Sequence, residues 1–383
     1  MRTLGTWFHL RDGRRSFKPD PLIDKQQMFC HQDVQAEVQF AIDKAFATGE
    51  TIKLLLWGDW GVGKTHTLRH LEYWLGDHPS EYPSRVVYVE IGDVAKNSRF
   101  GVVHKDLLDG IGLQSTIDMC FKYMRQGNDL VSDLEGIGIP VGIRQAFHKF
   151  FVAVPGQAPP DIAVAAWNFL RGADVGKTGV QLGLGGQITD SKEYYYVLAA
   201  LGHLVGKVES RQLVFLVDEA SKLEAVSDVL EVERHWVNVN KMIFDQENRF
   251  FGFVYTVSGK ADELPRALFE PQIENRLGKR VYELKTLGPD DVKRFLMNLR
   301  DSFVDRSLLD ADAGKDTRGS KGYSWESFPF TARALDRFVE YFQRTQENSK
   351  PRDIVQRLDD AAFYAMKADN RLVDEGTLDA LGI

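Results

Sequence analysis

The stretch Thr51-Ile-Lys-Leu-Leu-Leu-Trp-Gly-Asp-Trp-Gly-Val-Gly-Lys-Thr65 joins a short apolar run to a glycine-rich turn and a Lys-Thr pair. The apolar run, residues 51–57, is typical of a parallel strand that is buried on both faces. After the turn, apolar residues recur at helical spacing on one side of a predicted helix: Leu68, Leu71, Trp74 and Leu75. Strand, turn and helix in this order predict an α/β fold. The turn itself fits the pattern G-x-x-x-x-G-K-[ST] of a phosphate-binding loop.

The physical chemistry of this loop suits a phosphate chain. Glycines allow the backbone to wrap around phosphates with its N–H groups pointing inward, and the start of the next helix adds a positive dipole end. We expect Lys64 to reach the β- and γ-phosphates and the Thr65 hydroxyl to ligate Mg²⁺, so ATP and Mg²⁺ are the predicted cofactors. The predicted nucleotide-binding set is Gly58, Gly61, Val62, Gly63, Lys64, Thr65 and His66.

Further apolar runs predict four more strands, which alternate with helical patterns. We therefore predict a P-loop NTPase fold with a parallel sheet in a three-layer α/β domain. The predicted strands are 86–91, 213–217, 250–257 and 280–284.

An acidic pair, Asp218-Glu219, follows the predicted strand 213–217. Open α/β sheets bind ligands at the carboxyl ends of their strands. We expect Asp218 to hold Mg²⁺, mostly through water, and Glu219 to orient and polarise the attacking water. The alternative interpretation is a solvated acid pair at a strand end.

Three further positions are candidates for contact with the γ-phosphate. If the fourth strand lies between the first and third, a polar side chain at its end faces that phosphate; Ser258 is the first choice and Thr256 the second, unless these hydroxyls only shape a turn. Arg276 comes just before the fifth strand and could act on a neighbouring subunit's nucleotide; Arg280 competes for this role, and a solvated surface arginine is the alternative. Arg352 lies in the first turn of a predicted helix, where it opposes the helix dipole, which suggests a local anionic partner.

Two other glycine-rich segments resemble phosphate loops less closely. In Gly172-Ala-Asp-Val-Gly-Lys-Thr178 the first glycine is one residue too close, and the preceding residues look helical. Leu182-Gly-Leu-Gly-Gly186 lacks a following helix and an acidic partner. We interpret the first as a structural turn and the second as a loop.

The order of these patterns predicts three parts: an N-terminal arm at 1–24, an α/β domain at 25–287, and a helical lid at 288–383. About 120 residues separate the second and third strands, far more than a crossover needs, so 92–205 is predicted as a mostly helical insertion. Within the lid we expect one helix to begin at Pro289, further helices at 331–345, 351–367 (which also begins with a proline) and 373–383, and a charged loop at 310–323.

Composition limits the remaining possibilities. The chain has 383 residues, a net charge of −7 and 43% hydrophobic residues, an ordinary globular balance. No stretch is apolar enough for a transmembrane span, and the N-terminus lacks the pattern of a secretory signal. Cys30 and Cys120 cannot form a disulfide framework, so we expect thiols in a cytoplasmic protein.

These motifs in this order resemble the AAA+ ATPases, specifically the replication-initiator-like branch that includes origin-recognition and transposition-regulating ATPases. The resemblance covers about residues 25–92 and 205–383. Gly58–Thr65 resembles Walker A and Asp218-Glu219 resembles Walker B. Ser258 is at the approximate sensor-1 position, Arg276 resembles the arginine finger and Arg352 the sensor-2 arginine of the lid.

The resemblance implies an ATPase that forms rings or filaments of identical subunits and associates with duplex DNA. Two departures stand out: initiators usually carry a winged-helix module after the lid, which we do not expect here, and the insertion is longer than theirs. A looser similarity to ATPases of bacterial phage-exclusion systems, carried by Trp167–Gly172 and by later short matches, suggests phage defence or a mobile element.

Two functions follow from these observations. The first is a DNA-associated switch or motor whose nucleotide state controls assembly, which the order of motifs favours. The second is a nucleotide-dependent scaffold or signalling protein that acts on protein partners, through the 92–205 insertion for example; the acidic net charge favours it. A small-molecule kinase is a distant third, because an acid pair and a lid arginine suit attack by water better.

Overall fold

The computed structural model describes residues 3–152, 159–184, 187–188, 190–228, 231, 251–259, 280–313, 323–345 and 349–383. The chain divides into two compact units. The lid unit contains Met1–Gln35, Gly58–His70 and Leu284–Ile383, and the sheet unit contains Ala36–Trp57 and Leu71–Glu283. This division differs from the predicted boundaries, because the phosphate loop and the N-terminal residues group with the C-terminal helices.

A five-stranded sheet with the order β2-β3-β4-β1-β5 forms the centre of the sheet unit. The pairs β1–β5, β2–β3 and β3–β4 are parallel. All five predicted strands are confirmed, and the fourth strand lies between the first and third, which was the condition for expecting a polar residue at its end to face the γ-phosphate. The strands are β1 (Lys53–Gly58), β2 (Ser84–Glu90), β3 (Gln212–Asp218), β4 (Phe251–Ser258) and β5 (Arg280–Glu283).

Burial explains why β3 and β4 are almost entirely apolar. From Leu213 to Asp218 every residue of β3 is buried, and β4 is buried from Phe251 to Val257. Strands that are buried on both faces of a sheet show no alternation between polar and apolar residues, and β3 and β4 follow this rule.

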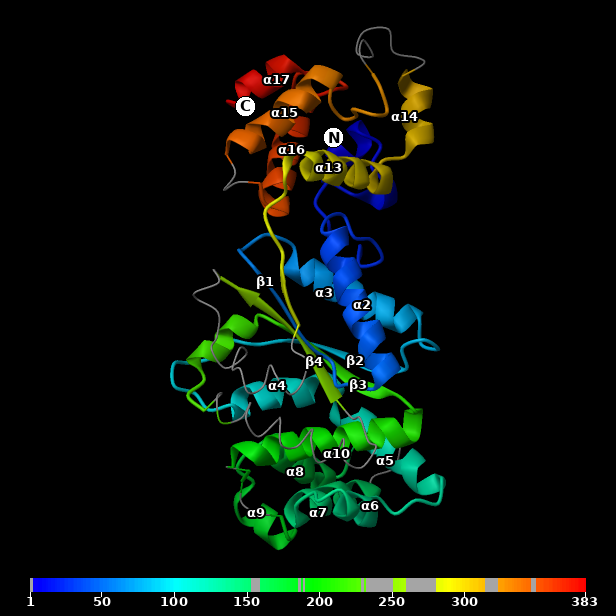
Figure 1. Ribbon diagram of the computed structural model, residues 1–383, viewed down its shortest axis with the longest axis vertical. Helices are drawn as coiled ribbons and strands as arrows, with labels where there is room; N and C mark the ends of the chain where they lie inside the picture. The colour runs from blue at the N-terminus through cyan, green and yellow to red at the C-terminus, as the bar shows by residue number, and fades with distance from the viewer. Residues whose placement is uncertain are drawn as a thin grey trace. The chain divides into compact units, whose positions relative to one another are not determined.

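Helix α10 (Ser191–Glu209) connects the sheet to the insertion. It packs against β3 and β4 and also against α5, while α4 (Gly101–Ile111) packs on β2 (Figure 1). One continuous apolar core joins strand residues such as Phe215 to insertion residues such as Phe147. The predicted helical insertion is confirmed, and its other helices are α5 (Leu113–Arg125), α6 (Leu130–Gly136), α7 (Val141–Lys149), α8 (Asp161–Leu170) and α9 (Gly176–Gln181).

The lid unit has a separate core built from C-terminal helices and the N-terminal residues. Trp7, Phe8, Leu10 and Phe17, in the segment predicted as a polar arm, are buried in this core. Its helices are α1 (Leu4–Trp7), α13 (Pro289–Phe303), α14 (Arg306–Ala313), α15 (Ala332–Arg344), α16 (Pro351–Lys367) and α17 (Glu375–Ala380).

The lid helices begin where the sequence signals predict. Pro289 and Pro351 occupy the first turns of α13 and α16, where a missing N–H costs nothing. Thr331 caps α15 by accepting a hydrogen bond from the amide of Ala334. The predicted loop at 310–323 is wrong in its first part, because α14 continues to Ala313.

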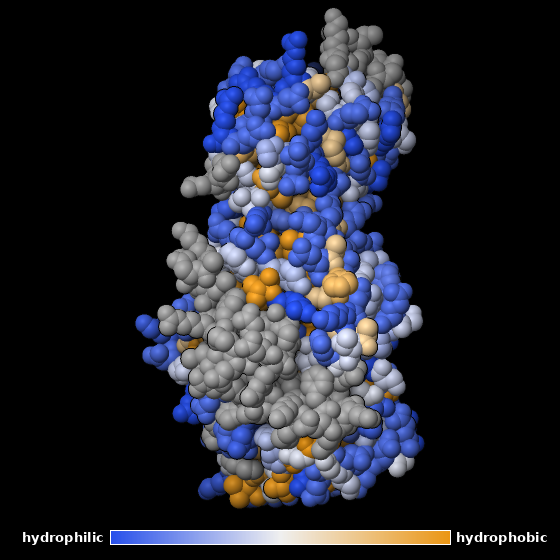
Figure 2. Space-filling view, in the orientation of Figure 1, coloured by the Kyte–Doolittle hydropathy of each residue, from blue (hydrophilic) through white to orange (hydrophobic). Residues whose placement is uncertain are grey.

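The face of the molecule drawn in Figure 2 is mainly hydrophilic where its residues are described. On the face drawn in Figure 2 apolar side chains are scattered among hydrophilic ones. Within the described ranges, no helix combines the length and apolar character that crossing a bilayer requires. Both cysteines, Cys30 and Cys120, are free thiols.

Candidate functional site

The loop between β1 and α3 (Lys64–Asp77) requires glycine at specific points. Gly61 has a φ of 84°, and a Cβ added there would lie 3.1 Å from Cβ of Arg352. A Cβ on Gly58 would lie only 2.4 Å from the carbonyl oxygen of Leu284. These positions therefore accept no other residue without a shift of the backbone.

Lys64 starts α3 and is only 7% exposed. Its ammonium donates hydrogen bonds to the carbonyl oxygens of Gly58, at 2.9 Å, and Asp59, at 2.7 Å. The positive charge is thus held inside the loop. Two backbone carbonyls of the loop serve as acceptors for the Lys64 ammonium in this structure.

The start of α16 contacts the same loop. The amide of Arg352 donates to the carbonyl oxygen of Gly61 over 3.3 Å. The ammonium of Lys350 lies 2.7 Å from a carboxylate oxygen of Asp59. This lysine, together with the amide of Trp60, holds the pKa of Asp59 below its ordinary value. The sequence predicted an anionic partner near Arg352; the structure brings Arg352 to the loop and gives the neighbouring Lys350 an anionic partner.

Three histidines fasten the N-terminal segment to the loop and to α3. A ring nitrogen of His31 lies 2.9 Å from the carbonyl oxygen of Val62. The rings of His66 and His70 contact carbonyl oxygens of the segment before α2 (Gln32–Thr48), at 2.7 Å and 2.8 Å. Burial lowers the pKa of all three histidines. Each therefore favours a neutral ring whose N–H donates to a carbonyl.

In the sheet unit, Asp218 ends β3 with its carboxylate fully engaged. It is 3% exposed and accepts hydrogen bonds from the Tyr88 hydroxyl, at 2.7 Å, and from the Thr256 hydroxyl. Glu219 follows with a φ of 59°, which is rare outside glycine, and its amide lies 3.3 Å from the Thr256 oxygen. Such backbone strain at a strand end is typical of functional turns.

The two hydroxyls of β4 are placed differently. Thr256 is 1% exposed and contacts Asp218 directly. Ser258, the first choice from the sequence, is the last residue of β4 and is only partly buried. The structure thus brings the second-choice residue to the acid pair.

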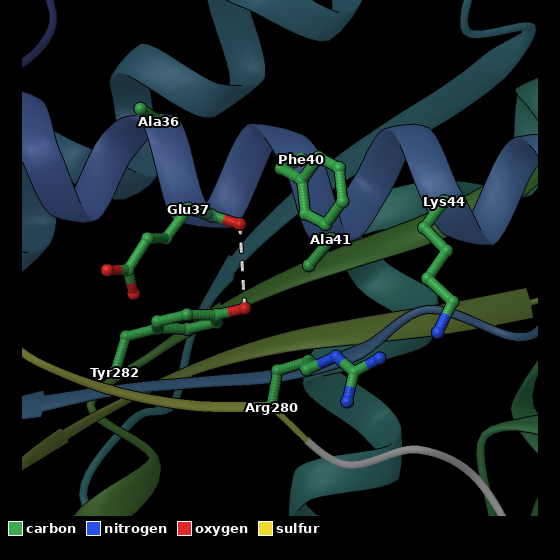
Figure 3. A pocket seen from close by; sticks show the side chains of 7 residues that line it. All are labelled: Ala36, Glu37, Phe40, Ala41, Lys44, Arg280 and Tyr282. Carbon is green, nitrogen blue, oxygen red and sulfur yellow. Dashed lines mark hydrogen bonds between the residues drawn. The ribbon is translucent and has the colours of Figure 1, made fainter.

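Of the two arginines proposed to act across subunits, Arg276 lies outside the described residues. Arg280 begins β5 and lines a groove of about 500 Å³ between that strand and α2 (Figure 3). Lys44, Phe40 and Tyr282 line the same groove, and the Tyr282 hydroxyl lies 3.5 Å from the carbonyl oxygen of Glu37. Arg280 therefore points toward α2 residues of its own unit.

The similar motif Gly172–Thr178 follows helix α8, as the sequence suggested, and has no preceding strand. Its Lys177 is exposed, and it leads into α9, which has only 6 residues. The amide of Gly176 is bound by the Asp174 side chain over 2.8 Å. The first part of this segment, residues 172–175, lies in the turn between α8 and α9, as predicted, whereas Gly176, Lys177 and Thr178 are the first residues of α9.

Several contacts were not anticipated from the sequence: those of Tyr88, Asp59 and Lys350. Tyr88 could have been found as a polar residue in an otherwise apolar run, Val-Val-Tyr-Val. The pair of Asp59 and Lys350 has no such signal, because its members are far apart in the chain.

The residues present suit a phosphate group and a magnesium ion. The first amides of α3 have no acceptor within the helix, and the buried ammonium of Lys64 lies beside them. The Thr65 hydroxyl and the Asp218 carboxylate are oxygen ligands of the kind that Mg²⁺ prefers.

No protein-family model matches the sequence, and no curated protein matches it either. Solved structures are similar in fold. The ORC2 protein of Aeropyrum pernix, in its ADPNP-ADP complexes, has a TM-score of 0.53 at 13% identity, and the match covers 97% of this chain and 71% of that chain. Its ADP form has a TM-score of 0.51 at 12% identity, with 97% and 72% covered. At this identity the likeness is one of fold.

The strand order and the glycine loop after β1 define an α/β P-loop NTPase fold. Within that class, the fold is similar to that of the ORC2 protein of Aeropyrum pernix along nearly the whole length of this chain.

Proposed function

We propose that the chain binds ATP and hydrolyses it as an AAA+ ATPase. The buried ammonium of Lys64 carries this proposal, because it is held between a glycine loop and the start of a 14-residue helix. The ADPNP and ADP bound to the similar ORC2 structure support the same ligand class. Thr65 and Asp218 would hold Mg²⁺, which neutralises phosphate charge when it is bound.

The acid pair at the end of β3 has separate roles in this proposal. Asp218 is fixed by the hydroxyls of Tyr88 and Thr256, which suits a carboxylate that must keep one geometry. Glu219 is partly exposed and itself has the strained backbone conformation, which suits a base that orients water. Ser258 stays a second candidate for sensing the γ-phosphate.

The lid contributes Arg352, whose backbone is bound to the loop through the carbonyl of Gly61. Its side chain would stabilise phosphate charge within the same subunit. Arg276, or Arg280 in its place, would act on the nucleotide of a neighbouring subunit. ATP is therefore proposed to favour oligomers, and hydrolysis to loosen them.

The variant Glu219→Gln tests the hydrolytic role. Loss of the base should lower kcat by about 10²-fold or more, while ATP affinity stays within about threefold, because only the transition state uses the base. Turnover of ATP, calorimetric affinity and oligomer size should be measured together. Normal turnover in this variant would refute the role of Glu219, and an absence of nucleotide binding by folded wild-type chain would refute the whole proposal.

The biological role has two candidates. We propose that nucleotide-dependent assembly controls association with DNA, as the resemblance of the sequence motifs to those of replication-initiator-like ATPases implies, in phage defence or a mobile element. The net charge of −7 instead favours a nucleotide-dependent scaffold with protein partners. Duplex DNA added to the assembly measurement separates the two: salt-sensitive binding that needs ATP and Lys64 supports the first candidate.

A further inference from the structure

The ion pair between Lys350 and Asp59 lies at the loop where phosphates are proposed to bind. Asp59 is the second residue of that loop, and Lys350 is the residue immediately before α16. The two charged atoms are 2.7 Å apart; the lysine side chain is 21% exposed and the carboxylate 54%. A mostly buried ammonium thus faces a carboxylate that is half open to solvent.

Asp59 binds two ammonium groups at once. Its carboxylate pairs with Lys350, and its backbone carbonyl accepts a hydrogen bond from Lys64 at 2.7 Å. Any ligand that draws Lys64 away from the loop carbonyls therefore acts on the residue that also holds Lys350.

The position of Lys350 does not depend on the ion pair alone. Two residues later, the amide of Arg352 is bound to the carbonyl of Gly61, which keeps the start of α16 against the loop. Pro351, between them, is buried and fixes the backbone at the helix start. If the carboxylate were removed, the ammonium would still lie beside the loop.

We propose that Lys350 is a second lid cation for the triphosphate, and that Asp59 occupies it until the phosphates arrive. This inference rests on the proposed function. A triphosphate carries several negative charges and a carboxylate only one, so the ammonium exchanges Asp59 for a phosphate oxygen. Asp59 then lies close to like charge, which limits the affinity for ATP.

The two partners have opposite effects in this arrangement. Lys350→Ala removes a phosphate ligand and leaves Asp59 without its counter-charge, so ATP affinity should fall about tenfold, the size of one charge-assisted hydrogen bond. Asp59→Asn removes the competing anion and the repulsion, so affinity should rise about threefold. A pair that only fastens the lid to the loop would shift both variants in the same direction.

The experiment measures ATP affinity of the full chain by calorimetry at low and moderate salt. Lys350→Arg should restore most of the lost affinity. The pair Lys293 and Asp336, 3.8 Å apart in the same unit, provides matched controls, and Lys293→Ala and Asp336→Asn should leave affinity unchanged. Equal or same-direction shifts for the two Lys350 and Asp59 variants would overturn the proposal.

A second measurement separates direct contact from a general charge effect. An acyl-phosphate derivative of ATP transfers its acyl group to amines beside the phosphate chain, and mass spectrometry locates the labelled lysines. Lys350 should be labelled, and more strongly in Asp59→Asn. Labelling of Lys64 without Lys350 would refute the contact while leaving the proposed ATP site intact; labelling of neither would count against the ATP site itself.

Discussion

Two segments of this chain read Gly-Lys-Thr, at 63–65 and at 176–178, and both begin a helix, yet what precedes them, the length of the helix and the burial of the lysine differ. The first follows a buried strand and begins a helix of 14 residues; the second follows helix α8 and begins one of 6. Lys64 is 7% exposed and bound to loop carbonyls, whereas Lys177 is exposed.

This difference shows that a Gly-Lys-Thr sequence alone does not make a phosphate-binding site. A strand end fixes where the loop starts, and a long helix supplies a substantial dipole and unsatisfied amides. Burial keeps the ammonium among the loop carbonyls in a setting of low dielectric, where its charge acts strongly. The segment at 172–178 has none of these features, and its amide at Gly176 is already bound by Asp174.

Matched lysine variants test this comparison with the largest expected effect. Lys64→Ala should lower kcat/KM for ATP by about 10³-fold, because the ammonium would contact phosphates both in the ground state and in the transition state. Lys177→Ala should leave kcat/KM within about twofold, as is usual for an exposed side chain. Steady-state hydrolysis assays on both variants, with calorimetric affinities, measure the contrast.

A comparable loss in both variants would break the comparison and assign the second segment a role in the reaction. Circular dichroism and thermal melting of each variant confirm that a loss of activity is not a loss of fold.

The central fold could be predicted because its signals are local. Apolar runs predicted all five strands, and the long separation between the second and third strands indicated a large helical insertion. Helix starts in the lid followed from Pro289 and Pro351. Each of these signals depends on neighbouring residues in the chain, so one sequence is enough to read them.

The parts that were missed depend on distant contacts. Trp7 and Phe8 lie in a segment with many charges, and their burial is explained by packing in the lid core, most of which comes from Leu287 and later residues. Similarly, choosing between Thr256 and Ser258 required knowing which side chain reaches Asp218. The residue pattern predicts strand β4, but only the contact with Asp218 on the neighbouring strand shows which hydroxyl lies at the acid pair.

The acid pair Asp218-Glu219 is the other part of the proposed ATP site, and the hydroxyls of β4 test its role. Thr256→Val removes the hydrogen bond to buried Asp218, so we expect hydrolysis to fall about tenfold to a hundredfold and stability to fall by about 1–3 kcal/mol. Ser258→Ala is the matched control with a smaller expected effect on both. Hydrolysis rates and urea unfolding of the two variants measure the difference.

Thr256→Ser keeps the hydroxyl and should recover much of the hydrolysis rate. If Ser258→Ala lowers hydrolysis more than Thr256→Val does, the first choice from the sequence is right and the buried contact is structural.

The smallest expected effect concerns the histidines that attach the N-terminal segment to the loop and helix around Lys64. No such histidine contact is seen for the described residues around Lys177. Burial lowers the pKa of His31, His66 and His70 below 6.5, although nearby carboxylates oppose the shift for the first two: Asp33 and Asp291 for His31, Asp24 and Asp20 for His66. The unfolded chain therefore binds more protons just below pH 6.5. Their contribution to stability is full above that pH and is lost as the pH falls through the lowered pKa values.

Local hydrogen exchange is the suitable measurement, because burial also lowers the pKa of His104 and His203 in the sheet unit to about 4, and global melting would mix the two units. Amides of residues 25–35 should lose protection between pH 7.5 and pH 5.5, since burial disfavours the charged form of each ring. His70→Gln, which keeps a side-chain donor but does not titrate, should weaken this pH dependence. Protection of 25–35 that is equal at both pH values would show that the neutral rings are not what holds this segment to the loop and to α3.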